Sequence, residues 1–194
     1  KRIIFASSGV SVYGKFSKSK ITESDPTMPT NHYGVSKLIF ENLLRVTSLY
    51  SDIQYSILRI SNPYGPGQSP FMNQGVISKF LWNVMHDKEI EIYGNPLSGR
   101  DFLYISDLLD AFELLLKNEL KESCVLNIGS GKMTTLQELL GLISEITAKQ
   151  PRIKYSAQRQ GDITKNCLNI SLAKMKLSWK PKINLKAGLL LTHD

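Results

Sequence analysis

The order of apolar segments near the start of the chain constrains the fold most strongly. Residues 2–7 form a short apolar run that ends in small polar residues, and the pattern predicts a helix over 31–50 and a strand over 53–60. Residues 9–31 are rich in glycine, proline and small polar residues, as loops are. A strand, a helix and a second strand in this order are typical of a parallel sheet. We therefore predict an α/β fold.

The rest of the sequence continues this alternation. The helix over 31–50 is expected to turn an apolar stripe toward the core, formed by Val35, Leu38, Ile39, Leu43 and Val46. Further along, the sequence predicts helices over 74–88, over 106–117 (capped by Ser106 or Asp107) and from Thr134 or Thr135, strands over 90–93, 100–105 and 125–128, and short elements after 151. Glu138 would complete a capping box if Thr135 is the cap.

Composition excludes several classes of protein. The 194 residues are 42% hydrophobic and 21% charged, as in ordinary soluble domains. No apolar run approaches the ~20 residues that span a membrane, and no secretion leader is visible, so we expect a cytoplasmic protein without membrane contact. Cys124 and Cys167 could form a disulfide, but two buried free thiols are the favoured interpretation. Their spacing predicts no metal site.

The net charge of +7 comes from 24 basic against 17 acidic residues. The basic residues are scattered, whereas nucleic-acid binding favours clusters interleaved with aromatic residues. We therefore expect no nucleic-acid partner. A solvated basic surface and an anionic small-molecule substrate both fit the charge.

Tyr33 and Lys37 are candidates for proton transfer. They lie four residues apart on the predicted helix and so share one face. An ammonium beside a phenol stabilises the phenolate and lowers the tyrosine pKa from its usual value of roughly 10, which suits catalysis near neutral pH. A hydroxyl from the earlier pair Ser7 and Ser8 could hydrogen-bond the same substrate oxygen. By itself the Y-x-x-x-K spacing also occurs in many surface helices, so its surroundings decide.

Four stretches provide those surroundings: residues 7–14 (SSGVSVYG), 33–37 (YGVSK), 58–67 (LRISNPYGPG) and 99–108 (GRDFLYISDL). Residues 126–131 (LNIGSG) and 159–162 (RQGD) are weaker matches. In this order they resemble the extended short-chain dehydrogenase/reductases, in particular the NAD-dependent nucleotide-sugar epimerases and dehydratases, such as the UDP-glucose 4-epimerases. Together they span most of the chain.

The resemblance implies a division of the chain. Residues 1–62 would be the late βαβ part of a Rossmann NAD-binding domain, and residues 63–194 would be mostly a small mixed α+β lobe for a nucleotide sugar, with segments near 100–128 returning to the sheet. Such proteins open with a G-x-x-G-x-x-G turn that holds the NAD pyrophosphate, and the 194 residues contain none. Because Lys1 also begins a predicted buried strand, we expect a fragment that binds NAD poorly and is inactive alone.

The resemblance also implies roles for the catalytic residues. Tyr33 would be the catalytic base and acid, and Lys37 would lower its pKa and hydrogen-bond the nicotinamide ribose of NAD. Ser8 is the best match for the hydroxyl that bridges Tyr33 and the sugar oxygen, with Ser7 and Ser11 as alternatives. Serine hydroxyls at a strand end also cap backbone groups, which is the alternative interpretation.

Other residues are expected to hold the ligands. Ser7 and Ile60 would lie beside the cofactor. The substrate-binding set comprises Ser11, Asn62, Arg100, Arg159 and Asp162. The arginines would grip the nucleotide diphosphate, because a guanidinium offers paired donors to phosphate oxygens. The alternatives are a plain turn at Asn62 and surface ion pairs at Arg100, Arg159 and Asp162. Asp107 and Asn127 are interpreted as structural, a helix cap and a turn.

The implied reaction is oxidation of a sugar hydroxyl, with the proton passing to the tyrosinate and a hydride to NAD, followed by return of the hydride to the other face of the keto-sugar. Dehydratases carry acidic residues just before V-Y-G, where this chain has Val10 and Ser11. We therefore favour 4-epimerisation of a UDP-sugar. Ile60 and Ser61 replace aromatic residues of well-known 4-epimerases, so the sugar and the carbon stay open.

Two alternatives remain at this point: a related dehydratase or reductase, and a non-catalytic module that binds nucleotide sugars. Family members often dimerise through the helix with the Y-x-x-x-K motif, so we expect a homodimer. An incomplete sheet would also leave an open strand edge, which we expect to pair with another chain or to promote aggregation.

Overall fold

A three-stranded parallel sheet forms the centre of the chain in its computed structural model, which describes residues 1–193 except 17, 73–74, 118–119, 121 and 159–164. The strands are β1 (Arg2–Ser8), β2 (Gln54–Ile60) and β7 (Cys124–Ile128), in the order β1-β2-β7. Ser8 is aligned with Ile60, and Ile60 with Ile128. The carboxyl ends of all three strands therefore meet at one edge, and the predicted α/β fold with a parallel sheet is confirmed.

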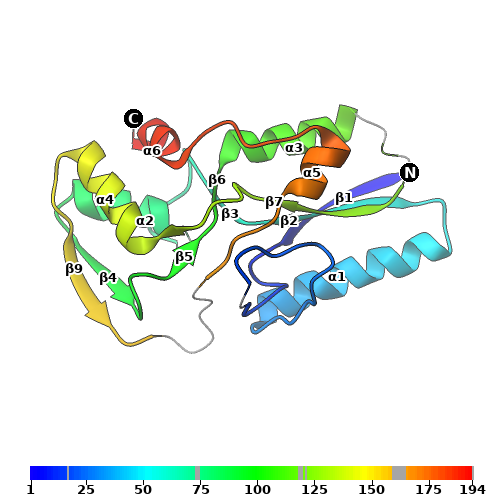
Figure 1. Ribbon diagram of the computed structural model, residues 1–194, viewed down its shortest axis with the longest axis horizontal. Helices are drawn as coiled ribbons and strands as arrows, with labels where there is room; N and C mark the ends of the chain where they lie inside the picture. The colour runs from blue at the N-terminus through cyan, green and yellow to red at the C-terminus, as the bar shows by residue number, and fades with distance from the viewer. Residues whose placement is uncertain (17, 73–74, 118–119, 121, 159–164, 194) are drawn as a thin grey trace.

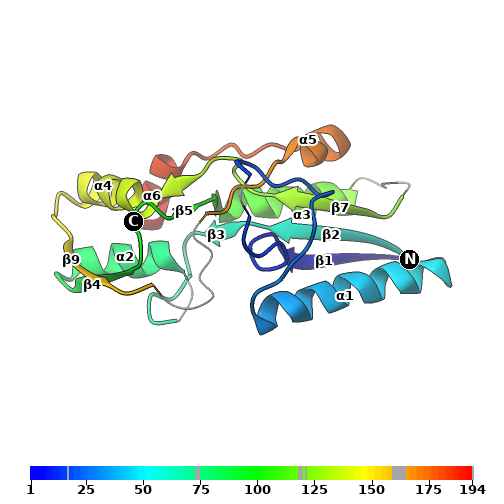
Figure 2. The same ribbon diagram turned by 60° about the horizontal axis from the view of Figure 1, so that its bottom comes forward.

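Helices cover both faces of this sheet (Figures 1 and 2). Helix α1 (His32–Leu49) lies along one face, while α3 (Ile105–Lys117) and α5 (Ser171–Leu177) lie on the other. The core between the sheet and helices α3 and α5 is apolar and includes Leu58, Leu126, Ala111, Leu115 and Trp179. This packing fixes the sheet edge on which the candidate site is built.

A second core lies beyond the carboxyl edge of the sheet. Three short strand pairs occur there: β3 (Asn62–Tyr64) with β6 (Phe102–Tyr104), β4 (Glu89–Tyr93) with β9 (Arg152–Ser156), and β5 (Gly99–Arg100) with β8 (Thr134–Thr135). Helices α2 (Val76–Met85), α4 (Leu136–Thr147) and α6 (Leu185–His193) pack around this core. The strand expected over 100–105 is divided at Asp101. The proposed domain division at residue 62 stays a prediction.

Local sequence sets most helix ends. The Asn31 side chain accepts a hydrogen bond from the Gly34 amide at 2.7 Å and so starts α1. Thr135 and Glu138 form the predicted capping box of α4. The prediction that Ser106 or Asp107 caps α3 is wrong, because the helix already begins at Ile105. Helix α2 is shorter at both ends than the predicted 74–88.

The predicted buried stripe of α1 is also wrong. Val35, Ile39, Leu43 and Val46 are between 43% and 54% exposed, and only Leu38 packs against a core cluster. The residues of α1 that are fully buried are Gly34 and Glu41. Apolar residues occupy most of the circumference of this helix, so their spacing alone does not indicate which side faces the sheet.

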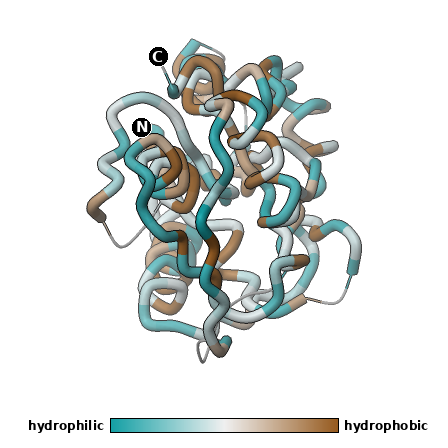
Figure 3. The backbone as a smooth tube through the Cα atoms, turned by 90° about the vertical axis from the view of Figure 1, so that its left-hand side faces the viewer, coloured by the Kyte–Doolittle hydropathy of each residue, from teal (hydrophilic) through white to brown (hydrophobic). Residues whose placement is uncertain are grey.

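Hydrophobic residues come in short stretches along the whole chain (Figure 3). In the described part of the chain, no helix is both long and apolar enough for a membrane crossing. Cys124 and Cys167 are buried and free, as the favoured interpretation predicted. Burial raises the pKa of the Cys167 thiol to about 11.

Candidate active site

A cavity of about 690 Å³ lies at the carboxyl ends of β1 and β2 and extends to α2 and β4. Its size is in the range of ligand pockets. Eight of the ten predicted site residues line it: Ser7, Ser8, Ser11, Tyr33, Lys37, Ile60, Asn62 and Arg100. The other two, Arg159 and Asp162, lie outside the described residues. The fold thus brings together residues that span more than 90 positions of sequence.

The Tyr33 and Lys37 pair stands on the first turns of α1. The Lys37 ammonium donates a hydrogen bond to the Ala6 carbonyl of β1 at 2.8 Å and lies 5.5 Å from the centroid of the Tyr33 ring. The Tyr33 side chain is 50% exposed and lines the cavity. The lysine is therefore fixed to the strand end, while the phenol stays accessible to a ligand.

Three of the serines that line the cavity, Ser7, Ser8 and Ser11, differ in their hydrogen bonds. The Ser7 hydroxyl donates to the Glu41 carboxylate at 2.6 Å and is thereby engaged in the structure. Ser8 Oγ accepts from the Ser11 amide at 3.2 Å, which leaves the Ser8 hydroxyl proton available to a ligand. A Cβ on Gly34 would lie 2.3 Å from the Ser11 carbonyl oxygen, so the glycine lets α1 approach this loop closely.

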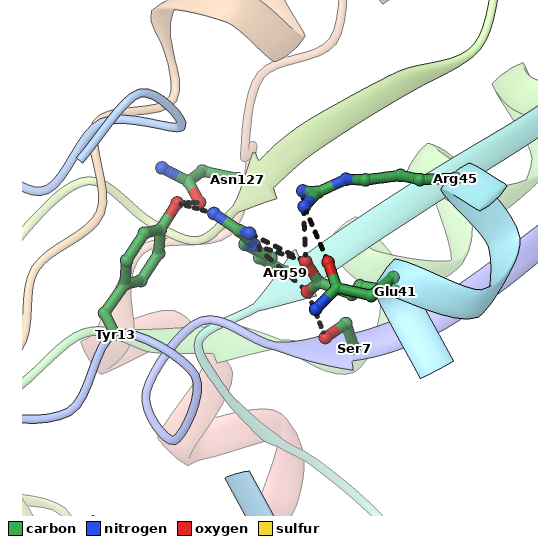
Figure 4. A network of polar contacts seen from close by, with 7 residues as sticks. Ser7, Tyr13, Glu41, Arg45, Arg59 and Asn127 are labelled. Atoms are coloured by element: carbon green, nitrogen blue, oxygen red, sulfur yellow. Dashed lines mark hydrogen bonds and ion pairs between the residues drawn. The ribbon is translucent and has the colours of Figure 1, made fainter. Parts of the chain in front are cut away.

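A buried polar network supports this end of the cavity (Figure 4). Arg59 is 2% exposed and Glu41 is fully buried, and the guanidinium donates to both carboxylate oxygens, with the shortest contact at 2.7 Å. Burial is the largest single effect and would lower the pKa of Arg59, but the hydrogen bonds and charges of Glu41 and Tyr13 together outweigh it, and the pKa is raised. Through Ser7, the network joins α1, β1 and β2.

Asn127 belongs to the same network. Arg59 Nη1 donates to the Tyr13 hydroxyl at 2.9 Å, which in turn donates to Asn127 Oδ1 at 2.9 Å. The Asn127 amide nitrogen donates to the carbonyl of Ile21. The prediction that Asn127 lies in a turn is wrong, since it belongs to β7, and its role is to join that strand to the loop over 9–31.

Asp101 organises the other side of the cavity, and the sequence analysis did not identify it. Its carboxylate is fully buried and accepts hydrogen bonds from the Ser130 amide and hydroxyl and from the amides of Gly131 and Leu168. Its carbonyl accepts from both the amide and the side chain of Asn62. Burial raises the pKa of Asp101, against the lowering by these hydrogen bonds. The neighbouring Arg100 is thereby held at the cavity wall.

Helix α2 and the loop before it contribute further lining residues that sequence reasoning missed, among them Gln68, Gly75 and Lys79. Gly75 has φ 95°, and a Cβ there would lie 2.7 Å from the side chain of Gln68. The Gln68 Oε1 atom is buried and has no hydrogen-bond partner among the described residues. Only the turn-rich sequence of the loop pointed to this region.

Asp107 lies outside the cavity. Its carboxylate accepts the backbone amides of Lys182 and Ile183, and its carbonyl accepts the Trp179 indole. It therefore ties the C-terminal segment to α3 instead of capping the helix. Across the described residues, no three or more His, Cys, Asp and Glu side chains are grouped so as to hold a metal ion.

The sequence matches the model of a known protein family. The sequence model of the NAD dependent epimerase/dehydratase family matches residues 1–129. The chain belongs to the NAD-dependent epimerase/dehydratase family. The match contains β1, β2 and β7 and all the described site residues, so the predicted resemblance is confirmed.

Relatives within this epimerase/dehydratase family include several enzymes. The chain is 39% identical over 189 residues to a dTDP-4-dehydro-6-deoxyglucose reductase of Escherichia coli. This match covers 97% of the chain and 59% of the reductase. The structure of a Thermotoga maritima UDP-glucose 4-epimerase with UDP-glucose has a TM-score of 0.94, with 34% identity, and the match covers all of this chain and 62% of that one. A Thermus thermophilus UDP-glucose 4-epimerase in complex with NAD has a TM-score of 0.92, with 30% identity, over all of this chain and 63% of that one. The chain therefore spans about 60% of the length of these relatives.

Proposed function

We propose that the cavity is the nucleotide-sugar site of an NAD-dependent epimerase that acts at C4 of a UDP-sugar through a keto intermediate. The observation that carries this proposal is the meeting of Ser8, Tyr33 and Lys37 with Asn62 and Arg100 in one cavity. In this proposal, Tyr33 is the proton-transfer group and Arg100 the phosphate-binding cation for a single elongated ligand in the cavity. Neighbours of known structure that bind UDP-sugars support the choice of ligand.

The residues of the chain provide the proton chemistry. Tyr33 takes the proton of the sugar hydroxyl and later returns it. Lys37, anchored on Ala6, holds a positive charge beside the phenolate that forms. Ser8 donates a hydrogen bond to the same sugar oxygen, because its own oxygen already accepts from Ser11. All three groups are held by β1 and α1, so their spacing does not depend on the ligand.

The residues present also fit the nicotinamide end of NAD. Lys37 and Tyr33 offer donors to the ribose, and Ile60 gives an apolar wall in the same cavity. When bound, NAD supplies the acceptor and donor of the hydride. The glycine turn that holds a pyrophosphate is absent from the 194 residues. We therefore propose that the chain alone binds NAD weakly and has little activity, which agrees with its span of about 60% of its relatives.

The diphosphate would bind at the far end of the cavity. Arg100 and Lys79 supply positive charge there, and the amino end of α2 begins at Gly75 on the cavity wall. Amide groups at a helix amino end favour anions. The side-chain nitrogen of Asn62 donates a hydrogen bond to the Asp101 carbonyl, so its side-chain oxygen can accept one from a ligand. Arg159 and Asp162 stay predicted substrate residues.

The lining of the cavity favours epimerisation over dehydration. Val10 and Ser11 line the cavity at the positions where dehydratases carry acidic residues, so no carboxylate faces Tyr33 from this loop. Glu91, the acidic residue on the lining, is on β4 and accepts hydrogen bonds from the Ser156 and Tyr93 hydroxyls. An elimination would need an acid or base beside the sugar.

A second candidate is a reductase of a dTDP-linked keto-sugar. The observation that favours it is the 39% identity to the Escherichia coli reductase, which is higher than the identity to either 4-epimerase of known structure described above. The same Tyr33 and Lys37 pair would then protonate the new hydroxyl. Tighter binding of dTDP than of UDP would favour this candidate.

We also propose that the protein is a cytoplasmic homodimer. The apolar exposed residues of α1, which include Val35, Ile39, Leu43 and Val46, support a contact between copies. The two buried free thiols suit a reducing compartment.

Calorimetric titration tests the proposed function. We expect the chain to bind UDP-glucose without NAD, and Arg100→Gln to weaken that binding by about tenfold or more, because a charge-assisted pair to phosphate is lost. Arg152→Gln, which changes an exposed arginine of β9, serves as the control and should bind as the unmodified chain does. Tight binding of NAD together with no binding of UDP-glucose would contradict the proposal.

A further inference from the structure

Ser61 is a buried cavity residue to which neither the family resemblance nor the proposed mechanism gives a role. It follows β2 directly, is 6% exposed and lines the cavity. Its backbone amide donates to the Ile128 carbonyl at 2.8 Å. Its hydroxyl oxygen, in contrast, has no hydrogen-bond partner among the described residues. Buried polar atoms are nearly always paired, so the orphaned hydroxyl of a residue on the cavity wall needs an explanation.

The sheet register gives the position of Ser61 relative to Ser8. Ser8 is aligned with Ile60 in the sheet, and the Gly9 amide donates to the Ile60 carbonyl at 2.8 Å. Ser61 therefore lies one residue beyond the last aligned pair, at the same sheet edge as Ser8. Arg100 and Lys79, the candidate phosphate ligands, come from β5 and α2 instead.

Neighbouring polar groups do not satisfy this hydroxyl. The Ser7 hydroxyl donates to Glu41, and the Asn62 amide nitrogen donates to the Asp101 carbonyl. A serine hydroxyl donates one hydrogen bond and accepts others. Its complement is a ligand group that also both donates and accepts, such as a sugar hydroxyl.

We propose that the Ser61 hydroxyl binds a hydroxyl group of the hexose of the nucleotide sugar and so contributes to the choice of sugar. The inference rests on the proposed function, because it needs the hexose at the end of the cavity near Ser8. A site built to hydrogen-bond a substrate hydroxyl discriminates against ligands that lack it, since the protein group is then left unpaired. The nucleoside diphosphate itself makes no contact with Ser61.

The test compares UDP-glucose with UDP by calorimetry, on the chain and on two variants. Ser61→Ala should weaken UDP-glucose binding by about three- to tenfold, the range of one net hydrogen bond, and leave UDP binding unchanged. Ser56→Ala is the matched control: Ser56 is a fully buried serine of β2, the strand that Ser61 follows, it is not among the lining residues of the cavity, and its oxygen lies 3.9 Å from the Cys124 thiol. It should alter neither affinity. The Tm of ligand-free Ser61→Ala should not fall, because no internal hydrogen bond is removed.

Three results would overturn the inference. Unchanged UDP-glucose affinity in Ser61→Ala would show that the hexose is not its partner and would leave the nicotinamide carboxamide as the alternative. Equal losses for UDP and UDP-glucose, or a lowered Tm, would show a structural effect. After any of these outcomes the proposed function still stands if the unmodified chain binds UDP-glucose. Failure of the unmodified chain to bind UDP or UDP-glucose would overturn the proposed function and this inference together.

Discussion

Glu41 and Arg59 are the residues on which the geometry near Tyr33 most depends. Both are buried, and Arg59→Met would leave the Glu41 carboxylate in the interior without its main partner. We expect a loss of about 3–5 kcal/mol in the free energy of unfolding, since an unpaired buried charge is strongly destabilising. Urea unfolding of Arg59→Met, of Glu41→Gln and of the double variant Glu41→Gln/Arg59→Met measures this loss. The double variant should lose less unfolding free energy than the two single variants lose in sum.

An exposed ion pair provides the control for this prediction. Lys186→Met removes the partner of Glu145, and both side chains are more than half exposed. Such pairs contribute about 0–1 kcal/mol. An Arg59→Met variant as stable as Lys186→Met would contradict the role assigned to the buried pair.

Asp101 gives a second prediction at this scale. Asp101→Asn replaces a carboxylate oxygen by an NH₂ group that faces backbone donors of Ser130, Gly131 or Leu168. The expected loss is about 2–4 kcal/mol of unfolding free energy, because buried donors are left unpaired. UDP binding should also weaken, because Arg100 and Asn62 are positioned by this residue.

Asp110→Asn is the comparison for Asp101→Asn. Asp110 pairs with the exposed Lys182 at the surface, so Asp110→Asn should lower the free energy of unfolding by no more than about 1 kcal/mol. Thermal or urea unfolding of the two variants distinguishes them. Equal stabilities would mean that Asp101 does not hold the cavity wall.

At the residue scale, the sequence indicated the candidate reactive residues of the cavity but not the residues that hold them in place. Tyr33, Lys37 and Ser8 could be found because they lie in short motifs. Glu41 and Arg59 are on different elements, and Asp101 contacts Leu168 far along the chain. Such pairs are formed only by tertiary packing, so no local spacing indicates them. Asp107 and Asn127 were recognised as structural, but their partners were not.

At the scale of elements, the sequence of helix α1 is constrained by the polar side chains that it turns toward the sheet. One side holds Lys37 and Glu41 against the sheet, so polar residues face inward. Apolar residues consequently remain outside, and the periodicity that predicted the helix over 31–50 correctly gave the wrong inward face. The βαβ order and the capping box at Thr135 were predictable because they depend on local sequence.

The exposed side of α1 carries the prediction about assembly. We expect self-association of the chain in sedimentation velocity, and a shift to monomer in the double variant Ile39→Lys/Val46→Glu, because charges replace apolar contact area. Both positions are 53–54% exposed, so the unfolding free energy of the monomer should change by less than about 0.5 kcal/mol.

Leu116→Lys is the control for that variant. Leu116 is 75% exposed and lies on α3, on the opposite face of the sheet, so this change should leave self-association as it is. An unmodified chain that is monomeric at all concentrations would contradict the proposed dimer. An equal effect of both variants would indicate non-specific association instead of a contact through α1.

At the scale of the whole molecule, the sheet edge and the second core form one cavity between them. The family resemblance made the shared site predictable, because its motifs lie at the ends of β1 and β2 and at the start of α1. The contribution of α2 through Gly75 and Lys79 was not predictable, since neither residue lies in a motif. The proposed function therefore requires one ligand that spans both parts.

A crystal structure of the chain with UDP-glucose tests this central claim most directly. The account predicts that the hexose lies within hydrogen-bond distance of Ser8 and Tyr33, and that the diphosphate contacts Arg100 near the amino end of α2. A diphosphate bound elsewhere, or a hexose that points away from Tyr33 toward β4, would contradict it.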